Sequence, residues 1–190
     1  MLEFEKIVVG CLQNDNKYKE VVYKSFYGYL MGIILRYVND RNDSEELVND
    51  TFIKIFKALN QFNYPQNKED NIKAFKAWIS KIASRTSIDF LRTKKRLLFI
   101  DDICETQEPF NDVNVITALN VKDILKLLDA LPETHKLIFN LFEIEGFSHD
   151  EISKLLNIPE SSSRVYLTRA KHKLRALYSK TLTDSYATNY

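Results

Sequence analysis

Two clusters of basic side chains are the residues of this sequence best suited to bind a charged partner. Between residues 160 and 180, six Lys and Arg residues stand against Glu160 alone. Between residues 85 and 96, five stand against Asp89. Clustered Lys and Arg side chains neutralise phosphates and are typical of nucleic-acid binding. We therefore expect two contacts with nucleic acid, and solvated basic helices in an ordinary bundle are the alternative.

The basic cluster near the C-terminus follows a helix-turn-helix pattern. Ser148 and Glu151 fit a capping box at the start of a short helix. Residues 157–159, Asn-Ile-Pro, would form the turn, and a second helix would start near Glu160. In such motifs the first turns of the second helix meet base edges, and later basic residues contact phosphates. The residues expected to face DNA are Ser161, Ser162, Ser163, Arg164, Thr168, Arg169 and Lys171.

The other basic cluster shares a predicted helix with two aromatic residues, Phe75 and Trp78. Aromatic rings beside cations can stack on unpaired bases, as in single-strand binding. The helical spacing of both rings also fits a place in the core, and for Trp78 the spacing favours the core.

An acidic segment carries Asp43, Glu46 and Asp50 at helical spacing, with Glu45 alongside. A metal-dependent nuclease is one interpretation, but no His or second carboxylate cluster completes an oxygen-rich cage. A solvated acidic face is another. The sharper interpretation is a docking face for a basic protein partner. We expect no catalytic residue, metal or cofactor.

The elements that position these residues are predicted to be helices throughout. The chain has 190 residues but only four Gly and four Pro, about a third of the roughly 12% in average proteins, which argues against turn-rich β folds. Apolar residues recur at helical spacing over 4–12, 18–38, 74–95 and 133–145, and Ser44 is a candidate N-cap for another helix. We predict an all-α fold of two small helical domains, 1–96 and 118–178, joined by an acidic flexible linker, 97–117, with a tail at 179–190.

Composition also suggests where the chain works. No stretch approaches 18 apolar residues, and the start of the chain is acidic where a signal peptide would be basic. Cys11 and Cys104 lie 93 positions apart, without a CxxC motif, which favours reduced thiols over a disulfide or zinc site. We expect a cytoplasmic protein with no direct membrane insertion.

Taken in order, these pieces resemble the extracytoplasmic-function group of RNA polymerase sigma factors, in the sigma-70 family. Residues 43–56 read DSEELVNDTFIKIF, similar to a family motif with Asn49 where Gln is usual. Residues 75–92 read FKAWISKIASRTSIDFLR and resemble a second motif. The pieces LPE at 131–133, EGFS at 145–148, IPE at 158–160 and LTRA at 167–170 match the C-terminal domain of the family.

The resemblance implies roles for particular residues. The acidic helix would dock on the β′ clamp of core RNA polymerase through Asp43, Glu46, Leu47, Asp50 and Phe52. The loop 62–73 and the helix after it would recognise and melt the minus-ten element of promoter DNA, through Asn63, Lys68, Asn71, Lys73, Trp78, Arg85, Arg92 and Lys95. The helix-turn-helix would read the minus-thirty-five element. The linker would thread toward the polymerase channels, and a membrane-anchored anti-sigma factor is a possible further partner.

Two departures from the family pattern stand out. At the start of the second helix, Ser163 stands where the family has Val, and Val165 stands where it has Ser. Ser84-Arg85 replaces the common Arg-Asn.

A conventional dimeric helix-turn-helix transcriptional regulator is the alternative function, and it would bind a palindromic operator tightly without polymerase.

Overall fold

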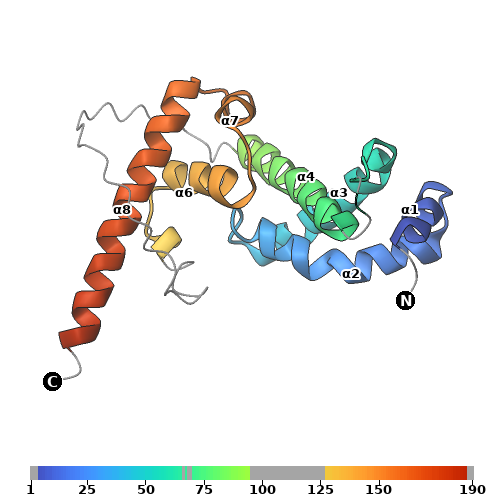
Figure 1. Ribbon diagram of the computed structural model, residues 1–190, viewed down its shortest axis with the longest axis horizontal. Coiled ribbons are helices and arrows are strands. Elements are labelled where there is room, and N and C mark those ends of the chain that lie inside the picture. Colours follow the sequence, from blue (N-terminus) through green and yellow to red (C-terminus); the bar gives the residue numbers. More distant parts are fainter. Residues whose placement is uncertain (1–3, 66, 68–69, 95–126, 188–190) are drawn as a thin grey trace. The chain divides into compact units, whose positions relative to one another are not determined.

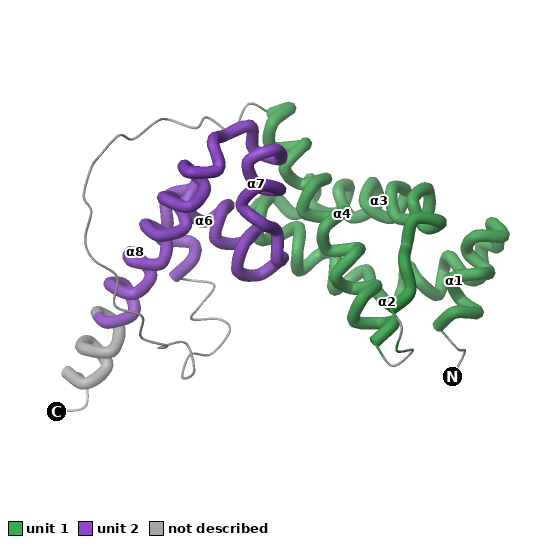
Figure 2. Tube along the Cα trace, turned by 45° about the horizontal axis from the view of Figure 1, so that its top comes forward, with its two compact units in different colours: residues 1–96 green, residues 97–190 purple. Residues whose placement is uncertain are grey.

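The computed structural model describes residues 4–65, 67, 70–94 and 127–187, with side chains up to residue 179 (Figure 1). Its elements are helical, and the described residues contain no strand, which confirms the all-α prediction. The chain divides into two compact units, Met1–Arg96 and Leu97–Tyr190 (Figure 2). The expected linker, 97–117, lies outside the described residues.

Unit 1 is built around helix α2. It contains α1 (Phe4–Leu12), α2 (Asn16–Ile34), α3 (Arg41–Ala58), the short 3-10 helix η1 (Leu59–Gln61) and α4 (Asn71–Thr93). Helix α2 packs against α1, α3 and α4, and α3 also packs against α4. The apolar stripes of the sequence meet here: the most buried side chains include Leu30, Ile33 and Ile34 of α2, Val48 and Ile55 of α3, and Phe75, Ile79 and Ile88 of α4.

Helices α2 and α3 of unit 1 begin at acidic N-caps. The Asp15 side chain accepts a hydrogen bond from the backbone N–H of Lys17 at 2.8 Å, and Asp40 accepts one from Asp43 at 2.9 Å. The prediction of Ser44 as an N-cap is wrong. Ser44 lies inside α3, fully buried, and its hydroxyl donates back to the carbonyl of Asp40 at 2.7 Å. Asp40 therefore performs the capping role, and it does so four residues earlier.

An aromatic cluster joins the N-terminus of α4 to the rest of unit 1. The ring of Phe75 lies 5.2 Å from the rings of Phe4 and Phe26 and 5.3 Å from that of Phe62, between ring centroids. These edge-on contacts fix where the loop after η1 returns to the helix. Helix α4 begins at Asn71, three residues before the predicted start.

Cys11 lies on α1 in the core of unit 1, 5% exposed. Burial raises the pKa of its thiol, which disfavours the reactive thiolate. A buried thiol of this kind is chemically inert. Cys104 lies outside the described residues.

Unit 2 packs two shorter helical segments against one long helix. It contains α6 (Glu133–Phe139), the π-helical turn η4 (Asn140–Ile144), α7 (His149–Leu156) and α8 (Glu160–Ala187). Both α6 and α7 pack against α8. The predicted single helix 133–145 thus widens at its end, where the N–H of Glu145 donates to the carbonyl of Asn140 at 3.0 Å. Gly146 follows in the left-handed region, at φ +70°, a conformation common just after the end of a helix.

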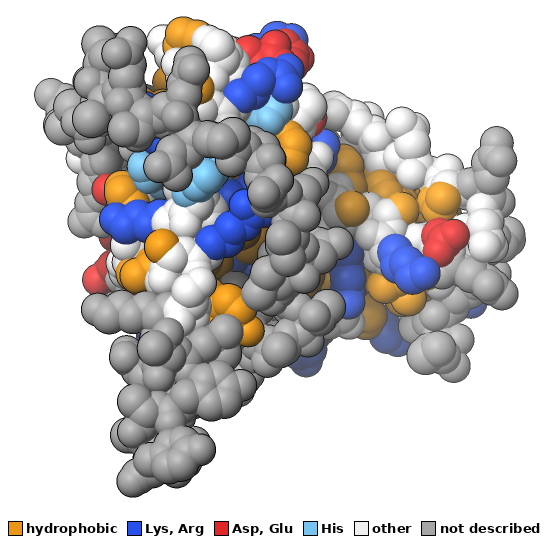
Figure 3. All heavy atoms as spheres, turned by 60° about the vertical axis from the view of Figure 1, so that its left-hand side comes forward, with side chains coloured by type: hydrophobic (Ala, Val, Ile, Leu, Met, Phe, Trp, Pro, Cys, Tyr) orange, Lys and Arg blue, Asp and Glu red, His pale blue; other side chains and the backbone are white. Residues whose placement is uncertain are grey.

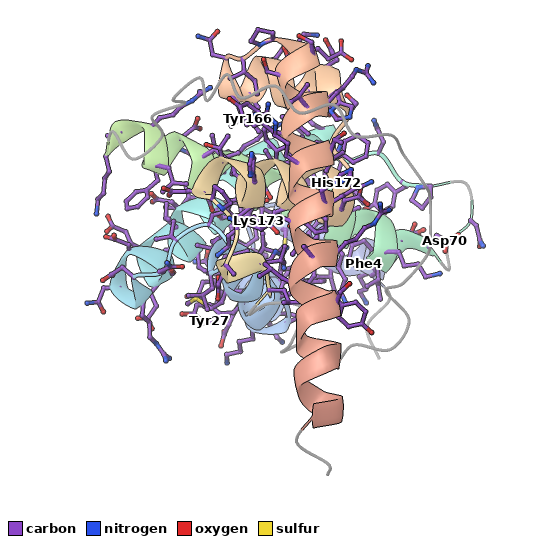
Figure 4. All side chains as sticks on the ribbon, turned by 90° about the vertical axis from the view of Figure 1, so that its left-hand side faces the viewer. Phe4, Tyr27, Asp70, Tyr166, His172 and Lys173 are labelled. Carbon is purple, nitrogen blue, oxygen red and sulfur yellow. The ribbon has the colours of Figure 1, made fainter. Side chains whose placement is uncertain are left out.

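Helix α8 is 28 residues long and continues into the segment 179–190 that we expected to be a tail. Figure 4 shows it with Tyr166, His172 and Lys173 labelled along its length. Tyr166 is buried against the rest of the unit, whereas Lys173 is exposed. Neither α8 nor any other helix in the described part of the chain is long and apolar enough to cross a membrane.

Candidate polymerase and nucleic-acid interfaces

Part of the exposed surface of helix α3 combines acidic and apolar side chains, and we call this part the α3 face. It consists of Glu46, Asn49, Asp50 and Ile53, which are spaced so that they share one side of the helix. Ile53 is 52% exposed, so an apolar side chain stands among polar ones. Asn49 also accepts a hydrogen bond from the Tyr23 hydroxyl at 2.9 Å. The α3 face therefore combines negative charge with an apolar contact point.

Asp43 differs from Glu46 and Asp50 of α3 because it forms an ion pair with another element of unit 1. Its carboxylate pairs with the ammonium of Lys94 at 2.8 Å, and that ammonium also lies 4.5 Å from the centre of the Phe90 ring. The pair joins the first turn of α3 to the residue after α4. Asp43 is thus already engaged within unit 1, where it links two helices.

Cationic side chains follow one another along α4. Lys73 is exposed and pairs with Asp70 at 3.2 Å, and Arg92 lies 3.8 Å from Asp89. Arg85 is exposed as well. These weak, solvent-exposed pairs cost little to exchange for phosphates.

The loop between η1 and α4 carries an exposed aromatic ring next to Trp78. Trp78 is half-buried and rests on Phe62 and Phe75, at 5.5 and 5.7 Å between ring centroids. Tyr64 lies 5.1 Å from Phe62 and is 42% exposed. Partial burial, and then the charge of Glu5, raise the pKa of Tyr64, so its hydroxyl stays protonated. Trp78 and Tyr64 thus form an aromatic edge on the surface of unit 1.

The helix-turn-helix of unit 2 has the predicted local geometry. The Ser148 hydroxyl accepts from the N–H of Glu151 at 3.1 Å, and the Glu151 carboxylate accepts from the N–H of Ser148 at 2.9 Å. Asn157 ends α7 in the left-handed region, at φ 54°. Ile158 is buried in the turn. The predicted capping box and the predicted turn at residues 157–159 are therefore confirmed.

The first turns of α8 have a buried side and an exposed side. Ser161, Arg164 and Val165 are exposed, while Ser162 and Thr168 are half-buried. Ser163 is fully buried, and its hydroxyl lies 2.9 Å from Nδ1 of His149 on α7. The guanidinium of Arg164 pairs with the carboxylate of Glu160, one turn earlier.

His149 lies between both helices of the motif. Its ring stacks on Phe142 at 4.3 Å between centroids. Burial is the main cause that lowers the pKa of His149, and the positive charges of Arg164 and Lys171 lower it further, against an opposing effect of Glu160. The imidazole is therefore held neutral, which suits its bond to Ser163.

One of the later basic residues of α8 contacts η4, the segment that follows α6. Lys171 pairs with Glu143 of η4 at 2.7 Å, and Arg169 is half-buried. Seen from the side of α8, Lys and Arg side chains lie next to His side chains on the surface (Figure 3). Among the described residues, no group of three or more His, Cys, Asp and Glu side chains could hold a metal ion.

Comparisons with known proteins give both units a family. A family model of sigma-70 region 2 matches residues 22–97, and one of sigma-70 region 4 matches residues 122–174. The RNA polymerase sigma factor SigV of Bacillus subtilis is 31% identical over 144 residues, which cover 76% of this chain and 81% of that protein.

The chain belongs to the sigma-70 family of RNA polymerase sigma factors, in its extracytoplasmic-function group. The extracytoplasmic-function sigma factor SigM of the same bacterium is 22% identical over 171 residues, 86% of this chain and 96% of that protein. A solved structure of the sigma factor RpoE from Bartonella quintana, in complex with the anti-sigma factor NepR, shares the fold, with a TM-score of 0.50 and 18% identity over 84% of this chain and 96% of that one.

Membership of the family also decides between the functions considered above. This sigma factor directs promoter-specific initiation of transcription by RNA polymerase. Sigma factors are non-catalytic initiation factors. A region 2 unit is not expected of a dimeric helix-turn-helix regulator, so the match over residues 22–97 does not favour that alternative.

Four residues that the sequence placed in the interfaces of this sigma factor are buried. Leu47 and Phe52 are 4% and 3% exposed in the core of unit 1, because the apolar half of their motif packs α3 against its neighbours. Asn71 is 4% exposed, and its amide points to Glu5 at 3.5 Å. Ser163 is buried against His149. These four side chains are covered within their own units, and their contact with a partner stays a prediction.

The remaining predicted residues divide by exposure. Asn63, Lys73, Arg85 and Arg92 are exposed in unit 1, and Trp78 is half-buried. Lys68 and Lys95 lie outside the described residues. Sequence reasoning missed Ile53, Tyr64 and Val165, which are 52%, 42% and 46% exposed. An apolar residue that interrupts a polar helix face, or an aromatic residue in a polar loop, is the signal that could have revealed them.

Proposed function

We propose that the two units divide promoter recognition between them. The α3 face binds core polymerase, α4 and the loop before it engage the minus-ten element, and the start of α8 reads the minus-thirty-five element. The observation that carries this proposal is the helix-turn-helix itself. Its capping box, left-handed turn and buried Ser163 orient Ser161, Arg164 and Val165 outward at the N-terminal end of α8, where such motifs contact base edges.

For the α3 face, its composition supports a protein partner. Protein interfaces commonly combine an apolar centre with a polar rim. Ile53 supplies the apolar point, while Glu46 and Asp50 supply negative charge for a basic surface on the polymerase clamp. Asp43 acts through its bond to Lys94, as a residue that positions α3 against α4.

For the minus-ten element, the aromatic edge of unit 1 supports contact with unpaired bases. Opening DNA exposes bases whose extrusion costs a few kcal/mol each, and contacts with the protein offset this cost. Trp78 and Tyr64 offer rings for stacking, and Lys73, Arg85 and Arg92 offer positive charge to phosphates. Two modest DNA contacts on one chain act together, so neither unit need bind tightly alone.

We also propose that this factor has no enzymatic activity of its own, acts in the cytoplasm and is restrained by an anti-sigma protein. The solved RpoE–NepR complex supports the last point, because its sigma factor shares this fold and holds such a partner. Whether that partner is membrane-anchored is a prediction from the resemblance alone.

Substitutions in α8 test the assignment of roles. With holoenzyme on a promoter that depends on this factor, Arg164→Ala should relax the preference at one base pair, at a cost of roughly 1–3 kcal/mol. Arg169→Ala and Lys171→Ala should weaken binding to all sequences and flatten its salt dependence. Identical behaviour of all three variants would contradict the division between base and phosphate contacts.

A further inference from the structure

Val165 is an apolar side chain on the exposed side of the recognition helix α8. It is 46% exposed, and no other large hydrophobic side chain on the described part of this helix is so exposed. Ser161, four residues before it, and Thr168, three residues after it, lie on the same side. Single exposed apolar residues are common on protein surfaces. Exposure alone therefore assigns no role to Val165, and its fixed place on α8 is the observation that matters.

The buried side of α8 shows that this position is fixed. Ser163, Tyr166, Leu167 and Ala170 are 0%, 8%, 6% and 0% exposed, and their spacing makes one continuous buried ridge. Ser163 occupies this ridge because His149 supplies a hydrogen-bond partner at 2.9 Å. The helix therefore does not rotate to bury Val165 in place of Ser163, and Val165 faces outward.

A polar neighbour of Val165 is engaged within the protein, because the Thr168 hydroxyl donates to the backbone carbonyl of Arg164 at 3.0 Å. Arg164 keeps further guanidinium donors for DNA beside its exposed pair with Glu160. The exposed surface of Val165 itself is apolar, formed by its two methyl groups. Such a surface has nothing to offer the hydrogen-bonding groups of a base pair.

We propose that Val165 is a specificity-determining residue that recognises the C5-methyl group of one thymine in the minus-thirty-five element. In the major groove the bases present hydrogen-bond donors and acceptors, and the thymine methyl is the apolar group among them. The inference rests on the proposed function, because it requires the start of α8 to lie in that groove. It assigns to this position an apolar contact where the family commonly has a serine hydroxyl.

A scan with deoxyuridine tests this contact, because uracil differs from thymine only by the missing methyl group. The binding of holoenzyme is measured on a promoter that depends on this factor, with each thymine of the minus-thirty-five element replaced in turn. For the unmodified protein, one replacement should weaken binding about fourfold, the effect of one buried methyl group. In Val165→Ser the same replacement should have no effect.

Ile144→Ser is the matched control, since Ile144 is 44% exposed in the same unit but lies outside α8. This variant should keep the penalty for uracil at the sensitive position. The inference is overturned if no single replacement weakens binding, or if Val165→Ser keeps the full penalty. Either result leaves the proposed function standing when the unmodified promoter is still bound and transcribed. No binding or transcription on any unmodified promoter would instead overturn both.

Discussion

Nδ1 of His149 lies 2.9 Å from the hydroxyl of Ser163, and this contact joins the two helices of the helix-turn-helix. The serine stands where the family commonly has valine, so a polar pair replaces an apolar contact. The pair fixes which side of α8 is buried, and with it the set of residues that can reach DNA. It also introduces a titratable group into the packing of unit 2.

The stability of unit 2 should fall as the pH drops below the ordinary pKa of histidine, about 6.5. The pKa of His149 is lowered in the folded protein, chiefly by burial, so the unfolded chain binds its proton first. Folding stability therefore rises with pH between the lowered value and the ordinary one. Chemical unfolding of the full chain at pH 5.5 to 7.5 measures the slope.

His149→Gln is the variant that tests this assignment. Glutamine can still donate to or accept from Ser163 but does not titrate, so the slope in this pH range should flatten. His172→Gln, on the same unit, should keep it. An unchanged slope in His149→Gln would show that another group causes the pH dependence.

A buried amide gives a second stability prediction. Asn140 is fully buried at the start of η4, and within the described residues neither its side-chain nitrogen nor its oxygen has a hydrogen-bond partner. Unmet buried polar groups cost about 1–3 kcal/mol each. Asn140→Leu, similar in shape, should raise the free energy of unfolding by about 1–2 kcal/mol, measured with denaturant.

Asn140→Asp provides the opposite control. A buried carboxylate without a partner should lower the free energy of unfolding near neutral pH. If Asn140→Leu is instead destabilising by more than 1 kcal/mol (roughly the net value of one hydrogen bond), the amide makes bonds that this structure does not show.

Local signals made parts of this fold predictable from the sequence, as the helix-turn-helix illustrates. The capping box of Ser148 and Glu151 and the turn around Ile158 depend on residues within a few positions of one another, and all were found as predicted. The N-cap of α3 was misplaced because Asp40 and Ser44 are both good capping residues, and only the path of the chain into α3 decides between them.

Exposure was harder to predict, because it depends on tertiary packing. Leu47 and Phe52 belong to a motif associated with docking, yet α2 and α4 cover that side of α3. Ser163 is buried only because His149 on another helix offers it a partner. Residues 97–117, expected to form the linker, lie outside the described residues, so that part stays a prediction.

Two aspartates on α3 should respond differently to substitution. Asp50→Ala should weaken binding to core polymerase with little effect on stability, because its side chain is exposed on the α3 face. Asp43→Asn should lower stability by up to about 1 kcal/mol, since its pair with Lys94 is partly exposed and screened by solvent. Equilibrium binding to core enzyme and denaturant unfolding separate the two effects.

The same variants address the nuclease alternative considered from the sequence. That alternative requires Mg²⁺-dependent cleavage of DNA that Asp50→Ala abolishes. We expect no cleavage of DNA by the unmodified protein or by Asp50→Ala. Unchanged polymerase binding by Asp50→Ala would argue against the α3 face as the docking site.

Tyr64 should contribute to strand opening through its ring. Stacking of a base on an aromatic side chain is worth about 1–3 kcal/mol, so Tyr64→Ala should reduce the amount of open complex about fivefold or more. Tyr64→Phe keeps the ring and should behave like the unmodified protein. Permanganate footprinting of the melted region measures the effect.

A promoter with a premelted minus-ten element refines this result. It should rescue Tyr64→Ala if the ring assists opening, whereas a loss that persists there would indicate a contact with DNA already open. Equal loss in Tyr64→Phe and Tyr64→Ala would show that the hydroxyl matters and would contradict a stacking role.

In vitro transcription with purified core RNA polymerase tests the central claim most directly. Genomic DNA of the source organism serves as template, and the 5′ ends of the transcripts are mapped with and without this protein. We predict new start sites that appear only with the protein and share two sequence elements, at minus ten and minus thirty-five. Transcripts identical to those of core polymerase alone would contradict its assignment as a promoter-specific initiation factor.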